Sequence, residues 1–302
     1  MADENGDRTD FIKRELAKMS IPEEYQVARV LAAAGFATQQ GRSYMGSDGK
    51  PREIDVVGEV TPEQIRPDET DELIRVWLVA EVKHTDGHPW VVLDSGGRPS
   101  AAEVADAAIA TDVVHASIRG GERREVPDLP WFFEQFARPV GHSLVVVGSK
   151  EDAAYAALSQ VVSAAVGLAG RRPEIEAQQL ELESLQLQMA MLRAAVRSDP
   201  GSAVRPGSGP VRKIVRKMRT YAWPVLVISG ELYVVDYLKG SANVVPADAS
   251  RLIWHGGPAG RPTVVDVVRQ SVLDDYADRA FKGLRALRQR LYFDARQGAA
   301  ST

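Results

Sequence analysis

The first part of the chain changes from a helical to a strand-like pattern of apolar residues. Between Pro22 and Phe36 the apolar residues recur at helical spacing, and Gly35 suits the end of this helix. Strands are predicted over Ala37 to Tyr44 and, after a turn at Gly46 to Gly49, through Asp55. We therefore expect a helix followed by two strands.

The strongest strand signal lies at 73–82. Its centre, residues 78–80, is apolar without interruption, which is typical of a strand covered on both faces. The acidic, Pro-containing stretch 59–72 before it is expected to form an extended hairpin loop. This arrangement makes the 73–82 strand a neighbour of the strand that carries Asp55.

Helical and strand patterns continue to alternate in the rest of the chain. They predict helices over 101–118, 150–168, 174–197, 211–219 and 264–292, strands over 142–148 and 251–254, and a β-hairpin of 223–229 with 232–238. The order of helix, three strands, helix, strand and helix predicts an α/β fold with a central mixed β-sheet flanked by helices. A C-terminal β-hairpin and helix form an extension to it.

Composition shifts divide the chain into four parts. Residues 1–15 are expected to be a flexible tail, and residues 16–168 the core domain. Residues 169–210 combine a long helix with a flexible linker rich in Gly, Pro and Ser. Residues 211–296 are expected to form an α/β extension packed on the core.

Charge and cysteine content exclude several classes of protein. The net charge of −4 argues against a uniformly basic surface, and the absence of cysteine excludes disulfides and thiolate metal sites. The five histidines are scattered, so a zinc site is not expected. The polar, acidic start and the lack of a long apolar stretch indicate a cytoplasmic protein without membrane association.

The candidate chemistry lies on the two neighbouring strands. Strand side chains alternate between faces, so Glu81 and Lys83 share one face and Val82 lies on the other. Charges at the end of an apolar strand are costly unless they are paired, bound to metal or used in catalysis. With Asp55 on the adjacent strand, this is the acid layout that would hold Mg²⁺ near a phosphodiester. An exposed edge strand with solvated charges is the alternative.

The first helix adds Glu24 to this set. Together, Glu24, the Ile54-Asp55 strand and Glu81-x-Lys83 resemble the PD-(D/E)XK nuclease superfamily, the restriction-endonuclease-like fold, and its Mrr-like branch in particular. The resemblance covers roughly residues 20–93, and the remainder only by the order of helices and strands. Ile54 replaces the superfamily's proline, and the gap from Asp55 to Glu81 is longer than usual.

The resemblance implies a role for each matching residue. Asp55 and Glu81 would ligate Mg²⁺ (or Mn²⁺), with the Val82 carbonyl as a further oxygen ligand. Lys83 would orient or activate the attacking water and offset charge on the phosphate. Glu24 would hold a second metal or a water; taken alone it is a first-turn acid that complements the helix dipole, and only the other acids make it a site candidate. Glu53, on the face of Asp55, is an accessory candidate from spacing alone.

Basic residues indicate where nucleic acid could bind. Four of them share one side of the predicted helix 211–219 at i,i+4 spacing: Arg212, Lys213, Arg216 and Lys217. A solvated helix face explains the same pattern. Trp90 is a candidate for base stacking, with a core position as the alternative, and no metal role is assigned to His84 or His88.

The sequence therefore predicts a Mg²⁺-dependent nuclease that hydrolyses phosphodiester bonds of DNA, and the resemblance implies a role in defence or DNA processing. RNA as the substrate and a homodimer remain open alternatives. The alternative from a different class is a catalytically inactive nucleic-acid-binding or protein-interaction module on the same fold.

Overall fold

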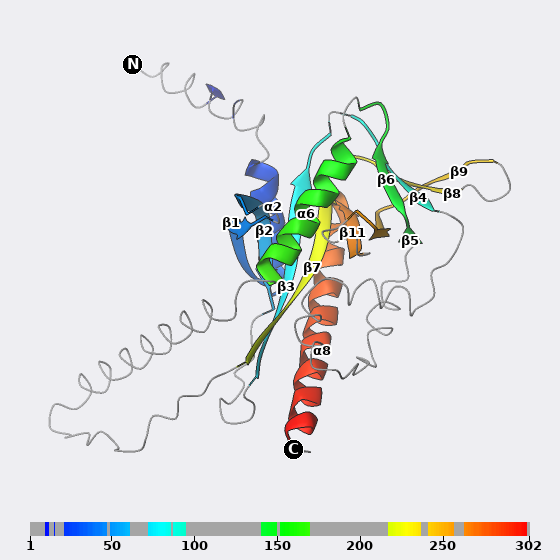
Figure 1. Cartoon of the computed structure of the whole chain (residues 1–302). Helices are drawn as coiled ribbons and strands as arrows, with labels where there is room; N and C mark the ends of the chain where they lie inside the picture. The colour runs from blue at the N-terminus through cyan, green and yellow to red at the C-terminus, as the bar shows by residue number, and fades with distance from the viewer. Residues whose placement is uncertain are drawn as a thin grey trace, which may run out of the picture.

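The structure, a computed structural model, describes residues 10–11, 15, 21–46, 49–60, 72–85, 87–94, 140–149, 152–169, 217–236, 241–256 and 263–300. It is a mixed α/β protein whose main sheet contains both parallel and antiparallel strands (Figure 1). The predicted α/β class with a central mixed sheet is confirmed. Within these ranges there is no helix with the length and apolar character that crossing a bilayer requires.

The described helices and strands follow one another along the chain in a fixed order. They are α2 (Ile21–Ala33), β1 (Ala37–Met45), β2 (Pro51–Glu59), β3 (Glu72–Lys83), β4 (Trp90–Asp94), β5 (Val140–Gly141), β6 (Ser143–Val146), α6 (Ala153–Ala169), β7 (Lys217–Ile228), β8 (Leu232–Asp236), β9 (Asn243–Pro246), β10 (Ala249–Trp254), β11 (Thr263–Arg269), the 3₁₀ turn η3 (Gln270–Val272) and α8 (Leu273–Ala300). The predicted helix and strands around Asp55 and Glu81 are confirmed within a few residues.

Two sheets form the framework. The seven-stranded sheet has the order β1-β2-β3-β7-β11-β10-β5, and the four-stranded sheet has the order β6-β4-β8-β9. β2 pairs antiparallel with β1 and β3, whereas β7 runs parallel to both β3 and β11. β3 and β7 therefore stand side by side in the seven-stranded sheet, with α6 as the described helix between them in the chain.

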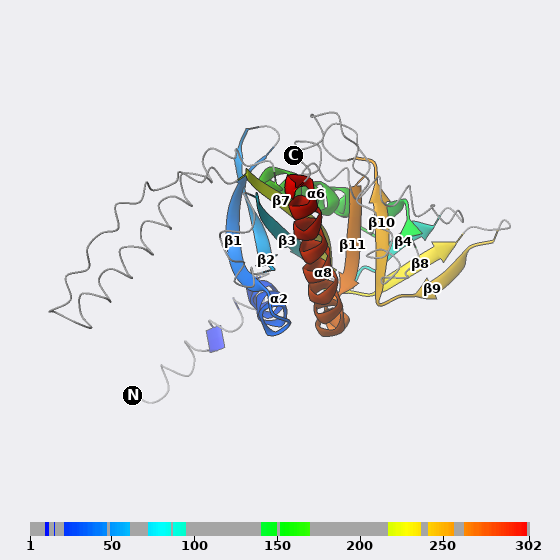
Figure 2. The same cartoon turned by 90° about the horizontal axis from the view of Figure 1, so that it is seen from below.

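Helices cover both faces of the seven-stranded sheet. α2 and α8 lie together on one face, and α6 lies on the other (Figure 2). Leu78, Ala80 and Val82 of β3 belong to the core under α2 and α8, whereas Trp77 and Val79 pack with α6. The continuous apolar run of β3 exists because both of its faces are buried, as the sequence predicted.

α2 ends where the sequence indicated. Gly35 has a φ of 109°, in the left-handed region where a side chain is strained. A Cβ at this position would also lie 2.9 Å from the ring of Phe281 on α8. The glycine therefore both stops α2 and lets α8 pack closely beside it.

A buried polar network fixes α8 on its face of the sheet. The carboxylate of Asp266 in β11 accepts hydrogen bonds from Arg251 Nε (2.8 Å), Trp223 Nε1 (3.0 Å) and Tyr276 Oη (2.8 Å). Burial alone would raise the pKa of Asp266, but Arg251 and these donors hold it below its usual value. The network thereby ties β7, β10, β11 and α8 together.

The predicted C-terminal hairpin is wrong. β7 and β8 flank the turn at Gly230 but do not pair, because β7 belongs to the seven-stranded sheet and β8 to the four-stranded one. β8 pairs instead with β4 and β9, and the antiparallel pair in this region of the main sheet is β10 with β11. A turn residue between two strand patterns does not specify that the strands pair.

Two predicted helices are also wrong in part. The closing helix does not start at 264, because Thr263–Arg269 is strand β11 and α8 begins at Leu273. The predicted basic helix 211–219 conflicts with β7, which begins at Lys217. Residues 264–268 are buried on both faces, so they lack the alternation that would have identified them as a strand.

Several predictions fall outside the described residues. These are the loop 59–72 apart from its ends, the helices 101–118 and 174–197, the linker before 211, and the tail 1–15 apart from Asp10, Phe11 and Glu15. The main sheet also joins both sides of the boundary predicted at 168, since β3 and β7 are neighbours. The predicted core and extension thus share one sheet.

Candidate active site

The site lies where β2 separates from β3. The antiparallel register of these strands runs from Glu59↔Trp77 to Val56↔Ala80 and ends there. One residue further, the Asp55 carboxylate takes the place of a backbone acceptor: its Oδ2 accepts a hydrogen bond of 2.7 Å from the Val82 N–H. The side chain of Asp55 is thereby fixed beside the end of β3.

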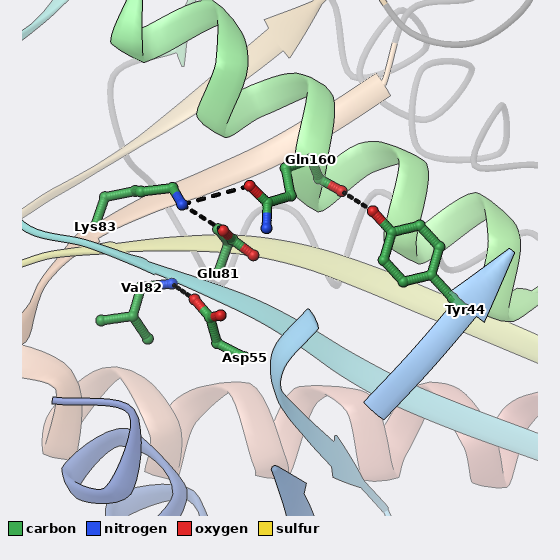
Figure 3. A network of polar contacts seen from close by, with 6 residues as sticks. All are labelled: Tyr44, Asp55, Glu81, Val82, Lys83 and Gln160. Carbon is green, nitrogen blue, oxygen red and sulfur yellow. Dashed lines mark hydrogen bonds and ion pairs between the residues drawn. The ribbon is translucent and has the colours of Figure 1, made fainter. Parts of the chain in front are cut away.

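β3 presents Glu81 and Lys83 on the face covered by α6. Lys83 Nζ lies 2.5 Å from Glu81 Oε1 and 3.4 Å from Gln160 Oε1 on α6 (Figure 3). Glu81 is fully buried, whereas the Lys83 side chain is 33% exposed. The predicted sharing of one face by Glu81 and Lys83 is confirmed.

One oxygen of Glu81 is unsatisfied. Within the described part of the chain, Glu81 Oε2 is buried and has no hydrogen-bond partner. A buried carboxylate oxygen without a donor costs free energy, on the order of 1–3 kcal/mol or more for a charged group. Such an oxygen is suited to accept a proton or a cation.

Both acids have raised pKa values. Burial raises the pKa of Asp55 to about 6, with the Val82 N–H opposing the change and Glu24 adding to it. Burial, followed by the charge of Asp55, raises the pKa of Glu81 to about 8, and Lys83 opposes this. Asp55 ionises first, while Glu81 is still protonated, so the repulsion between the two carboxylates acts on Glu81.

The Val82 backbone is oriented toward Asp55. The Val82 N–H donates to Asp55 on the β2 side. The carbonyl of the next residue, Lys83, accepts a hydrogen bond from the Ser229 N–H on the β7 side. The N–H and C=O of one strand residue point to the same side, and successive residues alternate. The Val82 carbonyl is therefore directed toward the side of Asp55, where a ligand oxygen was predicted.

Glu24 and Glu53 are two further acids whose charges act on Asp55. Glu24 is half-buried in the first turn of α2, and its charge raises the pKa of both Asp55 and Glu81. Glu53 is exposed and has a smaller influence on Asp55. Among the described residues, no three His, Asp or Glu side chains gather closely enough to form a metal-binding group. Asp55 and Glu81 are therefore the acids around which a site would be built.

The other candidates have different positions. Trp90 is 1% exposed and its Nε1 donates to Thr85 Oγ1, so the core alternative is confirmed. His84 lies 2.6 Å from Ser229 Oγ, at the ends of β3 and β7. Arg212, Lys213 and Arg216 lie outside the described residues, and Lys217 is the first residue of β7.

Gln160 is the site residue that the sequence did not indicate. It stands in the middle of the mostly apolar helix α6 and contacts Lys83 from a position 77 residues away in the chain. Its backbone oxygen also accepts a hydrogen bond of 3.4 Å from Tyr44 Oη on β1. A polar amide in a mostly apolar helix, which also carries Ser159 and Ser163, was the only signal, and it did not reveal the contact.

Fold and site together define a class: a mixed α/β protein with a fully buried glutamate and a lysine at the end of β3, and a partly buried aspartate on the neighbouring strand β2. In comparisons with known proteins, no family model, curated protein or solved structure matches this chain.

Proposed function

We propose that this protein is a metal-dependent nuclease that hydrolyses phosphodiester bonds of DNA on a restriction-endonuclease-like fold. The observation that carries the proposal is the fully buried Glu81: its Oε2 has no partner among the described residues, it feels the charge of Asp55, and it is paired with Lys83. The order α2, β1–β3 and, after the short strands β4–β6, α6 and β7 supports the resemblance to the PD-(D/E)XK superfamily. DNA as the substrate rests on that resemblance.

The residues fit a hard divalent cation. Among the described residues the Glu81 Oε2 atom lacks a donor, and burial first, with repulsion from neighbouring acids adding to it, raises the pKa values of Asp55 and Glu81. Mg²⁺ and Mn²⁺ prefer oxygen ligands, which the two carboxylates and the Val82 carbonyl would supply. When bound, such an ion polarises the phosphate and lowers the pKa of a water.

Each residue of the chain has a defined task in this proposal. Asp55, fixed by the Val82 N–H, and Glu81 would hold the cation. Lys83, partly exposed and on the face of Glu81, would orient the attacking water and stabilise charge on the phosphate. Glu24, at the edge of the site, would hold a second cation or a water.

The deciding experiment incubates the protein with plasmid DNA, linear DNA and RNA, with Mg²⁺, Mn²⁺ or EDTA. Cleavage is expected with either metal and not with EDTA, and Asp55→Asn and Lys83→Ala should each lower it at least 100-fold, in line with the loss of one catalytic group. Gln289→Leu, an exposed change on α8, is the matched control. Metal-independent cleavage, or activity retained in both site variants, would contradict the proposal.

A non-cleaving module on the same fold is the second candidate. It is favoured by the Lys83–Glu81 contact of 2.5 Å, because the ammonium partly offsets the charge of Glu81 without a metal. This candidate predicts that DNA binds equally well with EDTA and that no divalent cation binds. Calorimetric titration with Mn²⁺ therefore separates the two candidates.

A further inference from the structure

The Lys83 ammonium lies between two acceptors of different charge. It is 2.5 Å from the carboxylate oxygen Glu81 Oε1 and 3.4 Å from the amide oxygen Gln160 Oε1 (Figure 3). Typical N–H···O distances are about 2.7–3.2 Å, so the first contact is short and the second is long. The ammonium is held mainly by Glu81, with Gln160 within reach of a small side-chain movement.

The framework fixes Gln160 in this position. Its neighbours in α6, Ala157, Val161 and Ala164, are fully buried against the sheet, so the helix cannot rotate without exposing them. The Tyr44 hydroxyl donates to the Gln160 backbone oxygen and ties this turn of α6 to β1. The amide side chain is therefore presented to Lys83 by a rigid element.

A cation on Asp55 and Glu81 would compete with this ammonium. Two positive charges on one carboxylate repel each other, and the repulsion is strong where the carboxylate is buried. If Lys83 stayed on Glu81 Oε1, a cation would bind only through the remaining oxygens. A neutral acceptor next to Glu81 relieves the conflict, because it can take the ammonium without competing for the cation.

We infer that Gln160 is a positioning residue that takes the Lys83 ammonium from Glu81 when a divalent cation binds. The inference rests on the proposed function for its metal, and it identifies the group that sets where the lysine stands. A hydrocarbon at position 160 would leave the ammonium on Glu81. A carboxylate there would still accept it.

The first test measures the binding of Mn²⁺ by calorimetry. Gln160→Leu is expected to weaken binding about tenfold, the effect of one hydrogen bond to a charged group. Gln160→Glu should bind at least as tightly as the wild type, because it keeps an acceptor. Gln289→Leu on α8 makes the same change on the opposite side of the sheet and should have no effect. Thermal unfolding of all variants checks that the fold is retained.

The second test observes Lys83 directly. In protein labelled with [¹⁵N]lysine, the Nζ signal of Lys83, assigned through Lys83→Arg, should shift when Mg²⁺ is added to the wild type. In Gln160→Leu the shift should be absent or much smaller. This readout depends on the position of the ammonium and not on catalysis.

The outcomes separate the inference from the proposed function. Unchanged Mn²⁺ affinity in Gln160→Leu, or the same Lys83 shift in both proteins, overturns the inference even if DNA is cleaved. The protein could show a cation-dependent Lys83 shift that needs Gln160 and yet cut neither DNA nor RNA. This result supports the inference and rules out the nuclease function. If the wild type binds neither Mn²⁺ nor Mg²⁺, both are overturned.

Discussion

At the scale of single residues, Asp55 combines a structural and a chemical task. Asp55 lies one residue beyond Val56, the last residue of β2 that pairs with β3. Its carboxylate replaces a backbone carbonyl as the acceptor for the Val82 N–H. The same carboxylate raises the pKa of Glu81. These two effects can be separated, because an amide keeps the acceptor and removes the charge.

Asp55→Asn and Asp55→Ala are therefore expected to differ. The asparagine variant should be at least as stable as the wild type at neutral pH, since its Oδ1 can still accept from Val82 and it removes a partly buried charge. The alanine variant should be less stable than the asparagine variant by about 1–3 kcal/mol, because it leaves the Val82 N–H unsatisfied. Urea unfolding at neutral pH measures this difference.

Both Asp55 variants should lose Mn²⁺ binding in calorimetry, because each removes a charged ligand oxygen. Equal stability of the two variants would show that the hydrogen bond from the Val82 N–H does not stabilise the fold. Wild-type affinity for Mn²⁺ in the asparagine variant would show that Asp55 is not a ligand.

The raised pKa of Glu81 predicts that the stability of the protein falls as the pH rises. This pKa is about 8 in the folded protein and 4.5 in the unfolded chain, so between these values the folded state binds a proton that the unfolded chain has released. The free energy of unfolding of the metal-free protein should therefore fall from about pH 4.5 to about pH 8 and level off above. Asp55 adds a change of the same sign between 3.8 and about 6.

Urea unfolding in EDTA at several pH values checks this dependence. Glu81→Gln should flatten the upper part of the curve and be more stable than the wild type near pH 8, with the advantage shrinking toward pH 5. A wild-type curve that is flat over this range, or the same slope in Glu81→Gln, would rule out a buried Glu81 with a raised pKa.

At the scale of elements, α6 carries Gln160 to the site because it packs closely on β1. A Cβ on Gly167 would lie 2.7 Å from the Met45 carbonyl oxygen and 2.9 Å from the Tyr44 ring. The missing side chain allows the helix and strand to approach at this point. The position of Gln160, two turns earlier on the helix, depends on this contact.

Gly167→Ala should consequently destabilise the protein by about 1–3 kcal/mol, the usual cost of overpacking, although alanine is the better helix former. Urea unfolding measures the change, and Ser163→Ala on the same helix is the control. A gain in stability at position 167 would mean that α6 moves away from β1 without cost.

The sequence predicted the elements of the site better than the rest of the fold. Alternation and apolar runs identified α2 and β1–β3, and the period-two rule placed Glu81 and Lys83 on one face. The strand β11 was mistaken for helix because burial on both faces removes the alternation. Pairing partners such as β7 for β3, and the approach of Gln160, depend on tertiary contacts that no local pattern contains.

At the scale of the whole molecule, β3 and β7 join the two halves of the chain. They pair in parallel from Glu72↔Lys217 to Lys83↔Ile228, along the full length of both strands. Val225 and Val227 of β7 lie in the same core as Leu78 and Ala80 of β3. The strand that presents Glu81 and Lys83 therefore depends on a segment after residue 210.

A fragment of residues 16–168 is accordingly expected not to fold by itself. It contains Asp55, Glu81, Lys83 and Gln160 but lacks β7, so the apolar β3 would become an open edge with part of its core missing. Circular dichroism and urea unfolding should show no cooperative transition, and Mn²⁺ should not bind.

Residues 16–300 are the control, because they retain the described strands and helices from α2 to α8, and they should unfold in a single transition. Coexpression of 1–168 with 211–302 should restore a soluble complex, since the second fragment supplies β7. A cooperative transition and Mn²⁺ binding in 16–168 alone would instead establish it as an independent domain, in which β7 is dispensable for placing the acids and the lysine.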